Sequence, residues 1–195
     1  DCLLSRGLGD VYKRQALRYA MPAGATQGGI RLFGEQLAVV ASPWLLKSGK
    51  PLRTPADVAQ FTLIEAGDAH RTHYLEYLSW RRWFDTRDLT KLQPQRWLYF
   101  NYAHQIVQAA LAGQGLALAR MPLIADALAA GDLVEVLPGH RIDSPLAYWL
   151  MVGPRSAQRP EIKAFCAWLQ VQAEATRQAI GDVPDPDLND NLDGS

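Results

Sequence analysis

Apolar positions recur along this chain at strand spacing and at helical spacing in turn. The pattern is most compact between residues 95 and 122. Gln95 to Phe100 is aromatic and follows Pro94, which is typical of a buried strand, and Leu116 to Ala119 predicts a second strand. Between them, one helical face is apolar, at Ile106, Val107, Ala110 and Leu111. A strand, helix and strand in this order form a βαβ unit, which implies parallel strands.

The ends of that helix carry their own signals. Asn101 is a residue type that caps helix N-termini, so we expect its side-chain oxygen to accept a first-turn amide hydrogen. Gly113 and Gly115 should end the helix. Pro122 is expected in the first turn of the next helix, where the missing amide is not needed.

In open parallel sheets, ligands bind beyond the carboxyl ends of the strands, where helix N-termini point. Phe100 to His104 occupies that place in the predicted unit. Free amides and the positive end of the helix dipole favour a small anion there, such as a metabolite carboxylate. The alternative is that Asn101 is only a cap. Glu65 and Arg120 join the candidates because each ends a predicted strand, and His104 because it could titrate near neutral pH.

The rest of the chain continues the alternation, which indicates an α/β fold. Further strands are expected at 16–19, 30–33, 37–41, 61–65, 133–136 and 146–152, and helices at 44–46, 54–60, 74–84, 123–130 and from Pro160 onward. In this last helix the positions expected to face inward are Ile162, Phe165, Cys166, Leu169 and Val171.

Both termini are expected to lie outside the fold. Residues 1–15 have glycines and charges that break any period and resemble translated adaptor sequence, so we expect them to be non-native. Residues 179–195 are rich in Pro, Asp, Asn and Gly and predict a disordered tail.

Composition excludes several classes of function. Twenty basic and twenty acidic residues give zero formal charge, which is not typical of a surface that binds phosphate backbones. Cys2 and Cys166 cannot build a disulfide framework, so a reduced, cytoplasmic setting is expected. No apolar run approaches the roughly 20 residues that span a bilayer, and no signal peptide is recognisable.

Motifs for chemistry are weak or absent. His70 and His73 stand three residues apart in a polar loop, too few ligands for a metal site. No GxSxG, P-loop or CxxC motif occurs, so we expect neither an enzyme nor a cofactor. Trp80, Trp83 and Trp97 could form a platform for a sugar or base, but their spacing favours core packing.

Several ordered segments together resemble the effector-binding domain of LysR-type transcriptional regulators, especially the glycine-cleavage-activator branch. They are ALRYA, RLFGEQLAVVASPWLL, PLRTPADVAQFTLIE, the aromatic pair from Trp80 to Phe84, NYAHQIVQAALAGQGLALARMPLIADALAAGDLV, SPLAYWLMV and PEIKAFCAWL. The resemblance covers about residues 16 to 175, and AGQGLALARMPL is its most specific part.

The resemblance implies a periplasmic-binding-protein-like (type II) fold of two α/β lobes, with a metabolite in the cleft. Residues 16–41 would be a remnant of lobe I with the outward crossing strand, 42–145 a nearly complete lobe II, and 146–178 the return strand and C-terminal helix of lobe I. The first part of lobe I and the N-terminal helix-turn-helix that binds DNA would be missing. The expected partners are a small-molecule effector and further copies of the chain, as a dimer or tetramer, with DNA reached only through the absent domain.

The resemblance places the family's cleft positions near Phe33, Glu65 to Ala66, Phe100 to His104 and Arg120, which overlaps the site chosen above from helix-terminus physics. The candidate ligand-binding set is Phe33, Glu65, Phe100, Asn101, Tyr102, Ala103, His104 and Arg120. Arg14, Gln15 and Ala20 depart from the family pattern around Arg18, which favours a junction near residue 15. Two other classes stay open: a periplasmic solute-binding protein of the same architecture, and an enzyme on an α/β scaffold.

Overall fold

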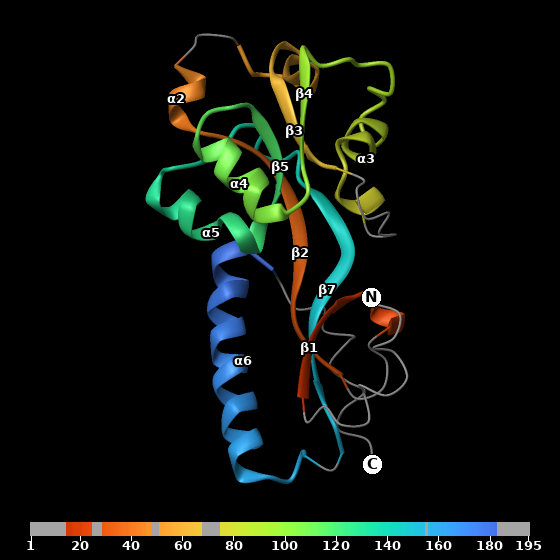
Figure 1. The fold of residues 1–195 in the computed structure, drawn as a ribbon, viewed down its shortest axis with the longest axis vertical. Coiled ribbons are helices and arrows are strands. Elements are labelled where there is room, and N and C mark those ends of the chain that lie inside the picture. The colour runs from red at the N-terminus through yellow and green to blue at the C-terminus, as the bar shows by residue number, and fades with distance from the viewer. Residues whose placement is uncertain (1–14, 25–28, 48–50, 68–74, 155, 183–195) are drawn as a thin grey trace. The chain divides into compact units, whose positions relative to one another are not determined.

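The computed structural model describes residues 15–24, 29–47, 51–67, 75–154 and 156–182 (Figure 1). Its strands are β1 (Gln15–Ala20), β2 (Gly29–Ala41), β3 (Thr62–Ala66), β4 (Arg96–Phe100), β5 (Leu116–Arg120), β6 (Val134–Glu135) and β7 (Ile142–Val152). Its α-helices are α2 (Pro43–Leu46), α3 (Trp80–Asp85), α4 (Ala103–Leu111), α5 (Met121–Ala130) and α6 (Pro160–Ile180), and short 3-10 helices are η2 (Pro22–Gly24), η3 (Pro55–Gln60) and η4 (Leu75–Leu78). The predicted pair His70 and His73, residues 1–14 and residues 183–195 lie outside the described residues. The first residues of the predicted tail 179–195 are ordered instead, because α6 continues to Ile180, which is buried.

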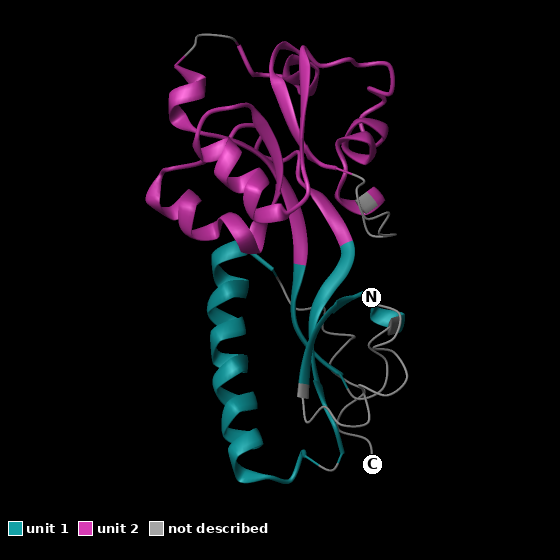
Figure 2. Cartoon of the chain, viewed as in Figure 1, with its two compact units in different colours: residues 1–34, 145–195 teal, residues 35–144 magenta. Residues whose placement is uncertain are grey.

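The chain divides into two compact units, residues 1–34 with 145–195 and residues 35–144 (Figure 2). We call them unit 1 and unit 2. β2 and β7 each run from one unit into the other, because the divisions fall within these two strands. The lobe limits drawn from the resemblance stay a prediction for the intact protein.

Unit 2 contains the βαβ unit that the sequence predicts, with one strand inserted. β3 pairs in parallel with β4, from Thr62 opposite Arg96 to Ala66 opposite Phe100. It also pairs in parallel with β5, with Leu63 opposite Leu116. The strands joined by α4 are therefore parallel, as expected, but they are separated by β3 rather than adjacent. β2 completes this part of the sheet by pairing antiparallel with β5 and β6.

The strand predicted at residues 95–100 is present as β4, but the expectation that it is buried was wrong. β4 is the last strand in the sheet order, and its side chains are partly or fully exposed. Tyr99 is 56% exposed, and its ring stacks on that of Trp97 at a centroid distance of 6.0 Å. β4 is an edge strand whose aromatic side chains are only partly covered. A short apolar run in the sequence does not distinguish such a strand from a buried one.

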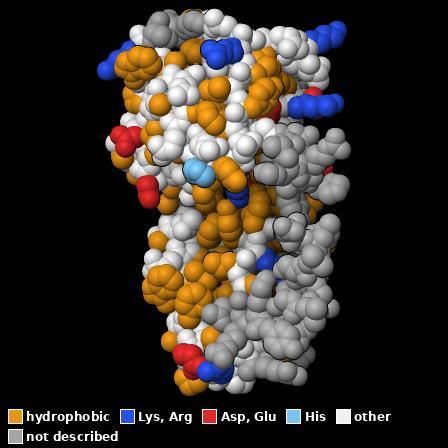
Figure 3. Space-filling view, viewed as in Figure 1, with side chains coloured by type: hydrophobic (Ala, Val, Ile, Leu, Met, Phe, Trp, Pro, Cys, Tyr) orange, Lys and Arg blue, Asp and Glu red, His pale blue; other side chains and the backbone are white. Residues whose placement is uncertain are grey.

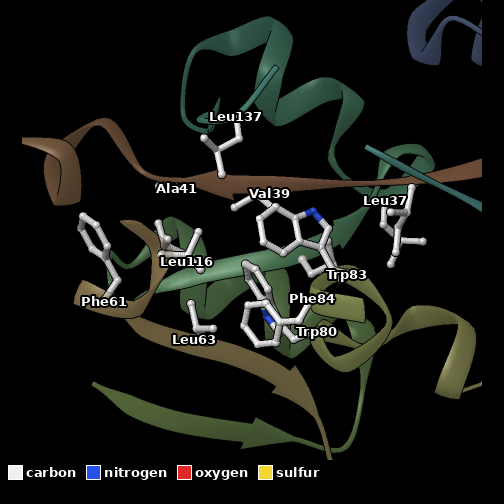
Figure 4. Close-up of a cluster of buried hydrophobic side chains, with 13 residues drawn as sticks. Leu37, Val39, Ala41, Phe61, Leu63, Trp80, Trp83, Phe84, Leu116 and Leu137 are labelled. Carbon is white, nitrogen blue, oxygen red and sulfur yellow. The ribbon is translucent and has the colours of Figure 1, made fainter. Parts of the chain in front are cut away.

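The core of unit 2 is built around two tryptophans (Figure 4). Trp80 and Trp83 are both fully buried, with ring centroids 5.3 Å apart in an edge-on arrangement. The indole N–H of Trp80 donates to the Ile64 carbonyl at 2.9 Å, and that of Trp83 to the His140 carbonyl at 2.9 Å. Since both polar tips are satisfied inside the unit, these rings pack the core and form no ligand platform, as their spacing predicted.

The predicted N-cap of α4 was wrong by one residue. Tyr102 occupies the cap position, and no side chain caps the helix there. Asn101 lies before the cap, exposed, with its side-chain oxygen beside Gly67. The C-terminal side follows the prediction, because the chain leaves α4 through Gly113 at a φ of +69°, a conformation that glycine adopts without strain.

Two other predicted elements differ from the structure. Residues 74–84 were expected to be one helix, but η4 and α3 are separate, because Ser79 caps α3 by accepting from the Arg82 amide at 3.2 Å. Residues 30–33 and 37–41 were expected as two strands, but they form the single strand β2, which runs straight through Gly34. Local turn residues suggested breaks that the strand pairing overrides.

Unit 1 combines β1, which pairs antiparallel with β7 from Gln15 opposite Val152 to Ala20 opposite Ala147, with the long helix α6. Leu32 and Leu150 pack against Ala173 of α6, with Cys166 and Leu169 partly buried beside them. Phe165 and Val171, predicted to face inward, are 37% and 65% exposed. Helical spacing alone did not distinguish the two apolar sides of this helix.

Replacement of Leu116 by alanine tests the core of unit 2. The Leu116 side chain is fully buried in the tryptophan cluster, so its loss leaves a cavity. We expect the free energy of unfolding to fall by about 2 to 5 kcal/mol. Leu123 is 44% exposed on α5, so Leu123→Ala should change it by less than about 0.5 kcal/mol. Urea denaturation measures both, and equal losses would contradict the packing described here.

Candidate functional site

The carboxyl ends of the parallel strands β3, β4 and β5 lie along one side of the unit 2 sheet, which we call its carboxyl edge. Ala66 pairs with Phe100, and the Gly67 amide donates to the Phe100 carbonyl at 2.7 Å, so the ends of β3 and β4 meet directly. The register of β3 with β5, in which Ile64 lies opposite Ala117, brings Arg120 level with residue 67 when it is continued. This is the edge at which open parallel sheets bind ligands.

The start of α4 supplies an exposed polar and aromatic group at this edge. Asn101, Tyr102 and His104 are exposed and Ala103 is partly exposed. The rings of Tyr102 and His104 stack with a centroid distance of 5.6 Å and an interplanar angle of 18°. The cap residue provides no side-chain acceptor, and the Gln105 amide donates to the Tyr102 carbonyl at 3.0 Å. Among the described residues, this leaves the amides of Ala103 and His104 for an external acceptor.

Glu65, near the end of β3, is half-buried and already has an internal partner. Its Oε1 accepts the backbone amide hydrogen of Trp80 at 2.8 Å, at the N-terminus of α3. Burial raises the pKa of the Glu65 carboxyl, and the amide hydrogen bond opposes that rise only in part. Glu65 lies opposite Tyr99 in the sheet, and burial together with the charge of Glu65 raises the pKa of the Tyr99 hydroxyl.

Arg120 links the end of β5 to the start of α5, and its guanidinium pairs with Glu35. Arg120 Nε donates to Glu35 Oε1. The Glu35 side chain is fully buried, whereas that of Arg120 is 18% exposed. A buried carboxylate is costly without a cationic partner, so this pair fixes the guanidinium at the edge of the sheet.

Glu35 was not predicted from the sequence as a site residue. The available signal was its place between Gly34 and Gln36 in an otherwise apolar strand, where an acid is unusual. Phe33 was identified, but it belongs to unit 1, where its ring lies 4.6 Å from that of Tyr148. The structure therefore groups seven of the eight candidates within unit 2, with Phe33 in unit 1.

No metal site is found among the described residues, where no three His, Cys, Asp or Glu side chains lie together. Within the same residues, no helix is both long and apolar enough to cross a membrane. On the face that Figure 3 shows, Lys and Arg side chains lie singly and form no basic patch in the part of the chain that is described.

Comparison with known proteins defines the class to which this fold belongs. The model of the LysR substrate binding domain matches residues 16–174, which is most of the chain. The chain belongs to the LysR substrate-binding domain family. Among curated relatives, the glycine cleavage system transcriptional activator of Escherichia coli K12 is 32% identical over 148 residues, covering 76% of this chain and 46% of the relative.

A second relative, the glycine cleavage system transcriptional activator homolog of Haemophilus influenzae, is 30% identical over 139 residues, covering 71% of this chain and 43% of that protein. The chain thus spans about half the length of the curated relatives that it matches. Both relatives are transcriptional regulators, which agrees with the resemblance drawn from the sequence.

Solved structures agree on the fold. The effector domain of the transcriptional regulator AmpR of Pseudomonas aeruginosa has a TM-score of 0.61 and 25% identity, with 89% of this chain and 77% of that domain covered. The full-length hypochlorite-specific LysR-type regulator HypT of Salmonella typhimurium has a TM-score of 0.56 at 17% identity, with 86% of this chain and 54% of that protein covered. The predicted periplasmic-binding-protein-like (type II) fold is confirmed.

Glu65→Gln tests the electrostatics of the sheet edge. Because the folded state raises the pKa of Glu65 above 4.5, it binds the proton more tightly than the unfolded chain does. The contribution of Glu65 to stability is therefore most favourable below pH 4.5 and declines as the pH rises from there through the folded pKa.

Glutamine removes this titration and keeps an oxygen for the Trp80 amide. We expect the free energy of unfolding of Glu65→Gln, measured by urea denaturation, to rise relative to that of the wild type as the pH increases from about 4 to about 7. Glu76 is exposed on η4, so Glu76→Gln serves as the control. A pH-independent difference for Glu65→Gln would contradict the raised pKa.

Proposed function

We propose that this domain binds a small anionic metabolite, a carboxylate or an amino acid, at the carboxyl edge of β3, β4 and β5 and acts as the effector sensor of a transcriptional regulator. The observation that carries this proposal is the uncapped start of α4. The side chain of the cap residue Tyr102 accepts no hydrogen bond from the first amides of α4, and the positive end of the helix dipole lies at the same place. Family membership supports a binding role over an enzymatic one.

The neighbouring side chains suggest how an anion would be held. Asn101 and His104 offer exposed polar groups at the start of the helix. Tyr102, 55% exposed, offers a ring face and a hydroxyl. Arg120, held by Glu35 at the end of β5, adds the positive charge of its guanidinium near the same place.

Binding would regulate through a shift between two states of the domain. An effector that contacts one state better than the other moves the equilibrium by its difference in binding free energy and by no more. We propose that the intact protein passes this shift to DNA through a separate DNA-binding domain and through a dimer or tetramer, in the cytoplasm. The relatives named as transcriptional activators support a regulator over a periplasmic solute-binding protein.

Removal of the aromatic ring at the start of α4 tests the site. Calorimetric titration of the full-length regulator with amino acids and small carboxylates would first identify a ligand. We expect Tyr102→Ala and His104→Ala each to weaken its affinity by roughly tenfold, the effect of losing one hydrogen bond or ring contact to a charged ligand. Both side chains are exposed, so thermal stability should change little.

Trp44→Ala is a matched control, because Trp44 is an exposed aromatic residue of the same unit, at 69% exposure, on α2. It should leave effector affinity unchanged. Unaltered affinity in both Tyr102→Ala and His104→Ala would refute the site. No heat of binding and no change in operator affinity with any amino acid or small carboxylate would refute the proposed ligand class.

A further inference from the structure

The C-terminal end of α6 is joined to β2 by a cluster of charged groups within unit 1. Asp182, two residues beyond the helix, accepts from both terminal nitrogens of Arg31, each at 3.1 Å. Its Oδ2 also accepts the backbone amide hydrogen of Gly34 at 2.8 Å. One carboxylate therefore receives three hydrogen bonds from a single short stretch of strand.

A second arginine makes the reciprocal connection. Arg177, in the last turn of α6, donates to the backbone carbonyl of Leu32 and also pairs with Glu174 on its own helix. Each element thus presents an arginine to the other: β2 offers Arg31 to Asp182, and α6 offers Arg177 to Leu32. The Arg31 and Asp182 side chains are only 20% and 16% exposed, so solvent screens their interaction less than at an open surface.

The dipole of α6 does not favour an acidic residue at position 182. Gly181 ends α6 at a φ of +73°, and Asp182 follows at the negative end of the helix dipole, where a carboxylate is disfavoured. The approaching Arg31 supplies the compensating cation. The charge of Asp182 is therefore matched to the strand rather than to its own helix.

Gly34 has a steric role in the same cluster. A Cβ atom at this position would lie 2.3 Å from Nη2 of Arg31 and 3.1 Å from Oδ1 of Asp182. Any larger residue must displace the guanidinium. Gly34 is also the last residue of unit 1 on β2, and the next residue, Glu35, begins unit 2 and pairs there with Arg120.

We propose that Arg31, Gly34 and Asp182, supported by Arg177, form a latch that holds the end of α6 on β2 and fixes the strand conformation where β2 leaves unit 1. The latch opens as one local cooperative unit, below the free energy of global unfolding. Its opening frees residues 29–36 and residues 174–182 together and leaves the helices of unit 2 folded. A change that breaks the Arg31 to Asp182 pair thereby loosens β2 next to the Glu35 to Arg120 pair.

Hydrogen exchange of the 195-residue chain, read by mass spectrometry of its peptides, tests the latch. Asp182→Asn keeps the size of the side chain and removes its charge. We expect the segments 29–36 and 174–182 to exchange faster by a common factor of roughly ten, since charge-assisted hydrogen bonds are lost. Residues 103–111 of α4 should keep the wild-type rate. The control is Asp126→Asn, at an exposed aspartate of α5, which should change neither latch segment.

Faster exchange in 174–182 alone would mean that only the helix end frays, and it would overturn the proposal. Equal acceleration in 103–111 would mean global destabilisation and would also overturn it, as would unchanged exchange. A second variant, Gly34→Ala, provides an independent check. In the otherwise wild-type chain, Gly34→Ala should raise the exchange rate of both latch segments. In an Arg31→Ala background the rise should be much smaller, because the guanidinium that the added methyl group would displace is already gone. Equal effects of Gly34→Ala in the two backgrounds would contradict the latch.

Discussion

The parallel pairing of β3 with both β4 and β5 is the constraint on which the candidate site depends. Parallel strands need a crossover connection, and here that connection is α4, which must begin where β4 ends. The same pairing directs the carboxyl ends of three strands to one edge of the sheet. The helix N-terminus, the end of β3 at Glu65 and the end of β5 at Arg120 therefore share an edge because of topology and not through local sequence.

Buried charge refines this arrangement. One carboxylate oxygen of Glu65 accepts a hydrogen bond from the N-terminus of α3, and Arg120 pairs with the buried Glu35, so neither is a free surface charge. Such pairs fix orientation more than they add stability, because desolvation offsets much of the attraction. Among the residues that the structure describes, Asn101, Tyr102 and His104 at the start of α4 are exposed and form no ion pair. The proposed effector contacts therefore centre on these three residues.

Much of the fold could be predicted from the sequence because periodicity and end signals were strong. β5, α5 with Gly131 at its end, and the buried Trp80 and Trp83 all follow the predictions. Local signals failed where tertiary contacts decided the outcome. The cap position of α4 moved from Asn101 to Tyr102, and the edge position of β4 depends on pairing with a distant strand. The partner of Arg120 is 85 residues away, so no local pattern could reveal it.

The two ion pairs on consecutive stretches of β2 give that strand a distinctive place in the molecule. Gly34 is bound to the end of α6 within unit 1, and Glu35 to Arg120 at the sheet edge within unit 2. The chain thus carries a fixed point on each side of the division between its units. Two residues that are adjacent in the chain, Gly34 and Glu35, therefore anchor β2 to different elements, α6 and the end of β5.

The central claim is that the effector binds at the start of α4. Hydrogen exchange of the full-length regulator, with and without a saturating effector identified by calorimetry, tests it most directly. Bound anions protect the amides that they accept from, so exchange of residues 101–105 should slow. Protection confined to other parts of the protein, with exchange at 101–105 unchanged, would contradict the account.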